Sequence, residues 1–230
     1  MAHFRDSENL TRWVRILLYA QIVVAIASLI SGYLEYQLLL SLQNGTFEAV
    51  EIALAESAAG DRRQLVVGVV YLILLIVSAV VILKWIHRAN YNARQLGAKG
   101  MDFTPGWAVG YYFIPILNLF KPYRAMKEIW KASKNPSRWA TQPASRILPL
   151  WWGLWITSNI LGQVIFRLAR RAEEIPELIG LNLVSQISDF LDIPLALALL
   201  VLVNEIHAMQ TTQRRRIESE GEVEAVEVPV

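Results

Sequence analysis

Asp189 and Asp192 are the residues whose type and spacing could do chemistry in this chain. They lie three positions apart in an apolar stretch, so in a helix both carboxylates share one face. Such a pair could serve as an acid and a base inside a membrane. Nothing in the sequence marks a nucleophile beside them, and the chain contains no Gly-rich phosphate loop, nucleophile elbow or HExxH zinc motif. We therefore expect no catalytic residue and no enzyme activity.

The three histidines have no spacing typical of metal ligands. His87 and His207 are both expected near the inner membrane surface, so a metal shared between them is an alternative, whereas His3 stands apart. The chain has no cysteine, which excludes thiolate chemistry and disulfides. We expect no metal and no cofactor.

Further polar side chains recur at helical spacing in the third and fourth apolar segments. These intramembrane polar residues are Asn159, Gln163, Arg167, Asn182, Gln186, Asp189 and Asp192. Ionisable groups inside a membrane are costly unless they are paired or face water, so we expect the two sets to meet in the outer half of a bundle, with Arg167 paired to Asp189. A polar clasp that fixes helix register and a site for a solute or proton both fit this pattern.

The elements that must position these residues are membrane helices. Hydrophobic residues make up 54% of the 230 residues and charged residues 18%, more apolar than an ordinary soluble domain. We expect an all-α membrane protein: a cytoplasmic N-terminus over 1–15, one membrane domain over 16–213 and a disordered acidic tail over 214–230. Four transmembrane helices are predicted, at about 16–40, 65–86, 147–168 and 182–209.

Small and polar residues follow one face of the first predicted span. They are Gln21, Ala25, Ser28, Gly32 and Glu35. Small residues let two helices approach closely in a membrane, so this face is interpreted as a contact between helices.

The charge distribution predicts the orientation in the membrane. Between Lys84 and Arg146 there are eleven Lys and Arg against two acidic residues, and three arginines follow the last span. Basic residues collect on the cytoplasmic side, so both termini are expected in the cytoplasm of a bacterium, with the protein in its cytoplasmic (inner) membrane. Nucleic-acid binding would require a separate soluble domain, so we expect none.

Between the second and third spans lies the signature segment, Pro105 to Ser133. Its uncharged part, 106–120, would extend only about 22 Å as a helix, less than the ~30 Å hydrocarbon core. Pro115 lacks a backbone N–H and disfavours helix before it, so two short pieces joined at a bend are expected. This segment is predicted to be re-entrant or interfacial.

An amphipathic helix is predicted over 121–134. Its apolar face carries Tyr123, Met126, Ile129 and Trp130. Its opposite face carries Arg124, Lys127, Glu128, Lys131 and Lys134. This pattern favours a helix lying at the membrane surface, with its lysines and Arg124 toward anionic head groups or a partner. The alternative is a soluble helix whose apolar face packs on a soluble core.

The signature segment resembles a bacterial membrane family catalogued as domain of unknown function 4328. The matching residues are Gly106, Trp107, Ala108, Val109, Gly110, Pro115, Asn118, Leu119, Pro122, Tyr123, Arg124, Ala125, Met126 and Trp130. More loosely, the resemblance extends from about Leu65 to the last apolar helix, where Val203, Glu205, Ile206 and Gln210 are similar to the closing pattern of the family. It implies a multi-pass membrane protein with no assigned activity.

Two functions fit these features. The favoured one is a membrane scaffold or accessory subunit that binds anionic lipid or a membrane partner through its basic cytoplasmic face. A homo-oligomer is a further possible assembly. The alternative is a small transporter or channel that uses the broken segment at Pro115 and the polar stripe of Gln163, Arg167, Asp189 and Asp192.

Overall fold

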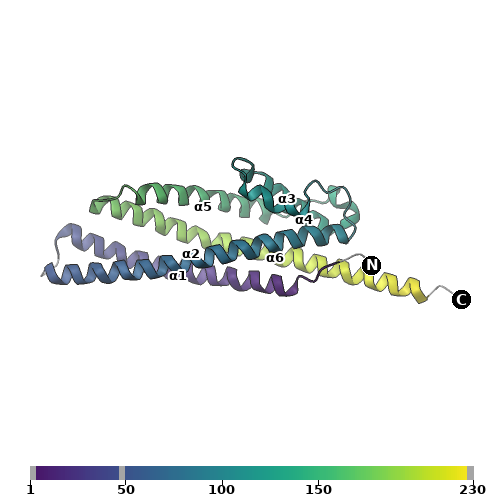
Figure 1. The fold of residues 1–230 in the computed structure, drawn as a ribbon, viewed down its shortest axis with the longest axis horizontal. Helices are drawn as coiled ribbons and strands as arrows, with labels where there is room; N and C mark the ends of the chain where they lie inside the picture. Colours follow the sequence, from purple (N-terminus) through teal and green to yellow (C-terminus); the bar gives the residue numbers. More distant parts are fainter. Residues whose placement is uncertain (1–3, 47–49, 227–230) are drawn as a thin grey trace. The chain divides into compact units, whose positions relative to one another are not determined.

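The computed structural model describes residues 4–46 and 50–226, and over these ranges the ordered elements are all helices. The long helices are α1 (Glu8–Asn44), α2 (Val50–Gln95), α5 (Ile147–Ala169) and α6 (Ile175–Val226) (Figure 1). The short ones lie between α2 and α5: α3 (Pro105–Gly110), η1 (Tyr111–Phe113), η2 (Leu117–Leu119), α4 (Lys121–Lys134) and η3 (Pro136–Thr141). The predicted all-α class is confirmed.

Within the described ranges, three helices are long and apolar enough to cross a membrane: Glu8–Asn44, Leu54–Gln95 and Ile175–Glu220. α5 is not among them, although its 23 residues would suffice in length. Its tryptophans, together with Asn159 and Gln163, lower its hydropathy. The structure therefore supports three of the four predicted spans by length and composition.

The long helices extend beyond the predicted spans. α2 continues past Lys84 to Gln95, so the start of the expected basic loop is helical. α6 continues to Val226, which differs from the disordered tail predicted over 214–230; residues 227–230 lie outside the described ranges. Within this extension Arg214 and Glu218 form an i,i+4 ion pair at 2.7 Å, a spacing that supports an exposed helix.

The chain divides into two compact units. Unit 1 comprises Met1–Arg15, Ala79–Trp152 and Ala198–Val230, and unit 2 comprises Ile16–Ser78 and Gly153–Leu197. Unit 1 therefore contains the signature segment, and unit 2 contains the intramembrane polar residues of α5 and the first part of α6.

The core of unit 1 is built around α4, which lies beside α3 (Figure 1). The side chains of Met126, Ile129 and Ala132 are at most 1% exposed, and Ala132 packs with Ala93 and Met101. The apolar face of α4 is thus covered by protein, so the predicted contact of this face with lipid is wrong.

Unit 2 brings α1 and α6 into close contact. A Cβ placed on Gly32 would lie 3.0 Å from Cγ of Gln186, and Ala25 is 1% exposed. These contacts confirm that the small face of the first span meets another helix. By contrast, only 6% of the most apolar stretch of α2 is buried, which leaves most of its surface unpacked by the rest of the chain.

Candidate functional site

The uncharged part of the signature segment, 106–120, is broken at Pro115 as predicted, with α3 and η1 before the break and η2 after it. Thr104 caps α3 by accepting a hydrogen bond from the backbone N–H of Trp107 at 3.3 Å. The chain reverses where Leu117 N donates to Pro115 O at 2.8 Å, which holds Ile116 at a φ of 68° and a ψ of −49°. This is the geometry of the classic γ-turn, which is rare and strained, and more so for a β-branched residue.

The large apolar side chains around this turn are exposed. They are Trp107 (52%), Phe113 (71%), Ile116 (73%), Leu119 (52%) and Phe120 (41%). The backbone that carries them is nevertheless fixed, since Asn118 N donates to Ile114 O at 3.0 Å and Trp152 Nε1 donates to Leu119 O at 3.0 Å. We call residues 113–120 the tip of the signature segment. Exposed apolar groups held in a fixed loop are typical of a surface that meets a membrane or another protein.

Other signature residues tie the tip to the rest of unit 1. Pro122 occupies the first turn of α4 and is buried, and the ring of Tyr123 lies 6.2 Å from that of Trp152. A Cβ on Gly110 would lie 3.4 Å from the Trp107 ring, whereas one on Gly106 would meet no neighbour within 4 Å. Pro122 and Tyr123 are thus the signature residues here that pack on unit 1, whereas the neighbour of Gly110 belongs to its own helix.

The basic residues of α4 differ in their surroundings. Arg124 and Lys134 are exposed, whereas Lys127 and Lys131 are half-buried. Lys131 Nζ donates to Ala140 O at 3.0 Å, and Lys134 Nζ lies 5.2 Å from the Trp130 ring centre. Lys121, at the end of the tip, lies near two aromatic rings. The predicted basic face is thus present, but only part of it is free to bind an external group.

Glu128, which the helical pattern placed on the basic face, is buried and clamps a loop. It is 5% exposed, and its two carboxylate oxygens accept from the backbone N–H groups of Asp102 (2.9 Å) and Phe103 (3.1 Å). Arg94 Nη2 donates to the carbonyls of Met101 and Phe103 at 2.9 and 2.8 Å. Burial raises the pKa of Glu128, an effect that these two backbone donors partly oppose.

Residues of α6 complete the network. Trp130 Nε1 donates to Glu205 Oε2 at 2.7 Å, and Gln210 Nε2 donates to Ala89 O at 2.8 Å and to Ser133 Oγ at 2.9 Å. Glu205 and Gln210, two of the residues similar to the closing pattern of the family, therefore make direct hydrogen bonds to residues of α4. Asn90 Nδ2 also donates to Phe103 O, at 3.0 Å. The sequence did not single out Asn90, Arg94 or Glu128, although an acid within a strongly basic stretch is a signal that could have been used.

The two described histidines, His87 and His207, differ in their surroundings. His207 Nδ1 lies 3.3 Å from Thr11 Oγ1, a hydroxyl that also accepts from Trp85 Nε1 at 3.1 Å. His87 is exposed, and His3 lies outside the described residues. In the described part of the chain no group of three or more His, Cys, Asp or Glu side chains is arranged to hold a metal ion.

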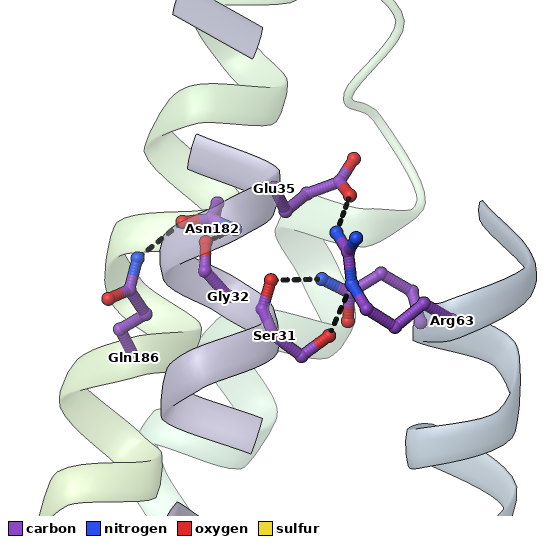
Figure 2. Close-up of polar contacts among 7 residues, drawn as sticks. Ser31, Gly32, Glu35, Arg63, Asn182 and Gln186 are labelled. Atoms are coloured by element: carbon purple, nitrogen blue, oxygen red, sulfur yellow. Dashed lines mark hydrogen bonds and ion pairs between the residues drawn. The ribbon is translucent and has the colours of Figure 1, made fainter. Parts of the chain in front are cut away.

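In unit 2, polar side chains link α1 to α2 and to α6, as Figure 2 shows. Arg63 Nε donates to Ser31 Oγ at 3.1 Å, and Arg63 Nη2 pairs with Glu35 Oε2 at 3.2 Å. On the α6 side, Asn182 Nδ2 donates to Gly32 O at 3.0 Å. Gln186 Nε2 in turn donates to Asn182 Oδ1 at 2.6 Å, so the cluster is a chain of polar contacts between helices.

Asp192 is held by two hydroxyl groups. Tyr71 OH donates to its Oδ2 and Ser158 Oγ to its Oδ1, each at 2.9 Å. The expected pairing of Arg167 with Asp189 is wrong: Arg167 is exposed, and the two do not form an ion pair among the described residues. Arg167 follows Ser158 by nine residues, about two and a half helical turns, so it lies on the opposite side of α5.

Asn159 and Gln163 share the exposed side of α5 with Arg167. Asn159 Nδ2 donates only to its own helix, at Trp155 O (2.7 Å), and the Gln163 side chain is exposed. The two predicted polar stripes therefore do not meet, and the α6 stripe finds its partners on α1, α2 and Ser158 instead.

These features define the chain as an all-helical protein, over its described residues, with three helices suited to a membrane. More particularly, it belongs to the family described as Domain of unknown function (DUF4328), whose model matches residues 49–208. The match includes the whole signature segment, Asp192 and Glu205. Comparison with curated proteins and with solved structures found no significant match.

Proposed function

We propose that this protein is a non-enzymatic membrane scaffold or accessory subunit that binds anionic lipid or a membrane partner through the basic, cytoplasmic face of unit 1. The observation that carries the proposal is the tip. Large apolar side chains are exposed there, directly before the basic start of α4. Apolar groups that enter the acyl boundary while neighbouring cations remain among the head groups are typical of interfacial binding.

The proposal includes a multi-pass topology. The three apolar helices and α5 would give four spans, with both termini in the cytoplasm of a bacterial cell and the protein in its inner membrane. Supporting this orientation, the basic residues between Lys84 and Arg146 belong to unit 1, where Arg124, Lys134, Arg138 and Arg146 are exposed. Segment 106–120 would then contact the inner leaflet rather than cross it.

Contact of the tip with lipid can be tested by fluorescence. A single cysteine at Ile116, the only thiol in a chain without native cysteine, would carry an environment-sensitive fluorophore in nanodiscs. We expect blue-shifted emission and quenching by lipids with acyl-chain nitroxides, because Ile116 is 73% exposed at the end of the tip. The matched control is Ser137→Cys, an exposed position in η3, which should be quenched little. Equal, weak quenching at both positions would contradict the proposal.

A charge-reversal variant tests whether the protein prefers anionic lipid. Arg124→Glu with Lys134→Glu changes two exposed cations, each worth about 1 kcal/mol near an anionic surface. We expect this double variant to remove the increase in Ile116 quenching that anionic lipid produces in the unmodified sequence. If quenching at Ile116 in the unmodified sequence does not depend on lipid charge, the tip contacts the membrane through its apolar side chains alone. The proposed binding of anionic lipid is then refuted.

The second candidate, a small transporter, rests on Asp192, an acidic residue in an apolar helix. Its two hydroxyl partners occupy both carboxylate oxygens, and Gln163 and Arg167, proposed to line the same path, are exposed on the far side of α5. These contacts favour a clasp between helices over a hydrated path.

Thiol accessibility separates the two functions. Single cysteines at Asn118 and Asp192 would be treated with a membrane-impermeant reagent, applied to intact cells and to inverted vesicles. We expect neither applied side to label Asp192→Cys, because the native side chain is enclosed by Tyr71 and Ser158. Labelling of Asn118→Cys from inside and Asp192→Cys from outside would instead establish a hydrated path and favour transport.

A further inference from the structure

The outward side of α5 carries polar groups where a membrane helix would be expected to be apolar. Asn159, Gln163 and Arg167 recur every four residues and are all exposed. Ser158, which faces Asp192, marks the inward side of the same helix. The polar stripe therefore points away from the other helices of unit 2.

Such a stripe cannot face hydrocarbon without cost. A side-chain amide that leaves water without a hydrogen-bond partner loses several kcal/mol, and an unpaired guanidinium loses more. Asn159 already donates to Trp155 O, so the cost falls mainly on Gln163 and Arg167. The inference rests on the proposed topology, in which α5 spans the membrane. Under that topology, protein from outside the chain must cover the stripe.

We propose that the covering protein is a second copy of this chain, with α5 packed against α5 about a two-fold axis along the membrane normal. Two copies inserted with the same orientation bring identical positions together, so each residue near the axis meets itself. An amide carries both donors and an acceptor, so Gln163 can bind the Gln163 side chain of a second copy, and Asn159 likewise.

A further observation fits this arrangement. The exposed cation of Arg167 has anions within the same chain segment: Glu173 and Glu174 follow the end of α5 and are exposed. In a symmetric pair these carboxylates can offset the repulsion between the two arginines.

Disulfide trapping in native membranes tests the pair. Gln163→Cys and Asn159→Cys, each made singly in the cysteine-free chain, should form a disulfide-linked dimer of twice 26.1 kDa on mild oxidation. Ile73→Cys is the matched control. The Ile73 side chain is 58% exposed on the apolar surface of α2, and this variant should stay monomeric. In the double variant Asn159→Leu, Gln163→Leu, dimerisation measured by energy transfer between labelled copies should weaken about five-fold for each lost hydrogen bond.

The outcomes show separately whether the contact between two copies of α5 fails or the proposed membrane topology on which it rests fails. If Gln163→Cys reacts with a membrane-impermeant maleimide as readily as Ser137→Cys, α5 is in water and the proposed topology fails. If Gln163→Cys is protected from the maleimide but neither α5 cysteine cross-links more than Ile73→Cys, the topology stands and the two-copy contact is refuted. Unchanged energy transfer in the leucine double variant would also refute a contact made through these amides.

Discussion

Replacing Glu128 by glutamine is expected to destabilise unit 1 by about 2–3 kcal/mol. The carboxylate is buried and accepts one backbone N–H on each of its two oxygens. Glutamine keeps one acceptor and turns its amide N–H₂ toward the other backbone donor, leaving that donor without a partner. The unfolding temperature of the purified protein in detergent, read by tryptophan fluorescence, would measure the change, with the exposed Glu220→Gln as control.

The same residue gives a pH dependence. Because the pKa of Glu128 is raised in the fold, the folded state retains a proton that the unfolded state has released. Stability contributed by this group is therefore present below the unfolded pKa of glutamate and is lost as the pH rises toward the folded pKa. Glutamine does not titrate, so the stability difference between the unmodified protein and Glu128→Gln should narrow across that window. A difference that widens with pH would show that the carboxylate is preferred in its charged form.

Gly32→Leu is expected to disrupt the contact between α1 and α6. Even a Cβ at this position would lie 3.0 Å from Gln186 Cγ, and the carbonyl of Gly32 accepts a hydrogen bond from Asn182. Overpacking typically costs about 1–3 kcal/mol and the loss of one hydrogen bond about 1 kcal/mol more. We expect a clear fall in the monodisperse fraction after heating in detergent, measured by size-exclusion chromatography, and a smaller fall for Gly32→Ala.

Gly68→Leu provides the matched control for this change. It introduces the same side chain into a helix of the same unit, but a Cβ there meets nothing within 4 Å. Leucine is also a better helix former than glycine, so this variant should be at least as stable as the unmodified protein. Equal losses for Gly32→Leu and Gly68→Leu would mean that close packing at Gly32 is not what stabilises α1 against α6.

What the sequence predicted well follows from local rules. Apolar length located three of the helices suited to a membrane, and the missing N–H of Pro115 correctly predicted a break in the signature segment. Small residues at helical spacing correctly marked the face of α1 that meets another helix, at Ala25 and Gly32. In each case the information lies within a few neighbouring residues.

The errors share another cause: periodicity shows which residues lie on one face but not what covers that face. The apolar face of α4 was assigned to lipid, whereas it packs on unit 1, and Glu128 was placed with the basic residues although it binds a loop 25 residues away in sequence. Likewise, periodicity shows that Arg167 shares a stripe of α5 with Asn159 and Gln163. Which way this stripe points depends on the contact of Ser158 on α5 with Asp192 on α6. Such long-range contacts leave no local pattern.

The hydrogen bonds that fix the tip have a consequence for the free energy of its proposed contact with a membrane. A loop that is disordered before binding loses about 1–2 kcal/mol of conformational entropy for each residue that becomes ordered. Here the γ-turn at Ile116 and the bonds to Ile114 O and Leu119 O already hold the backbone in place. In the proposed membrane contact the tip would therefore act as a preorganised wedge, and its apolar side chains would contribute their transfer free energy without a prior folding step.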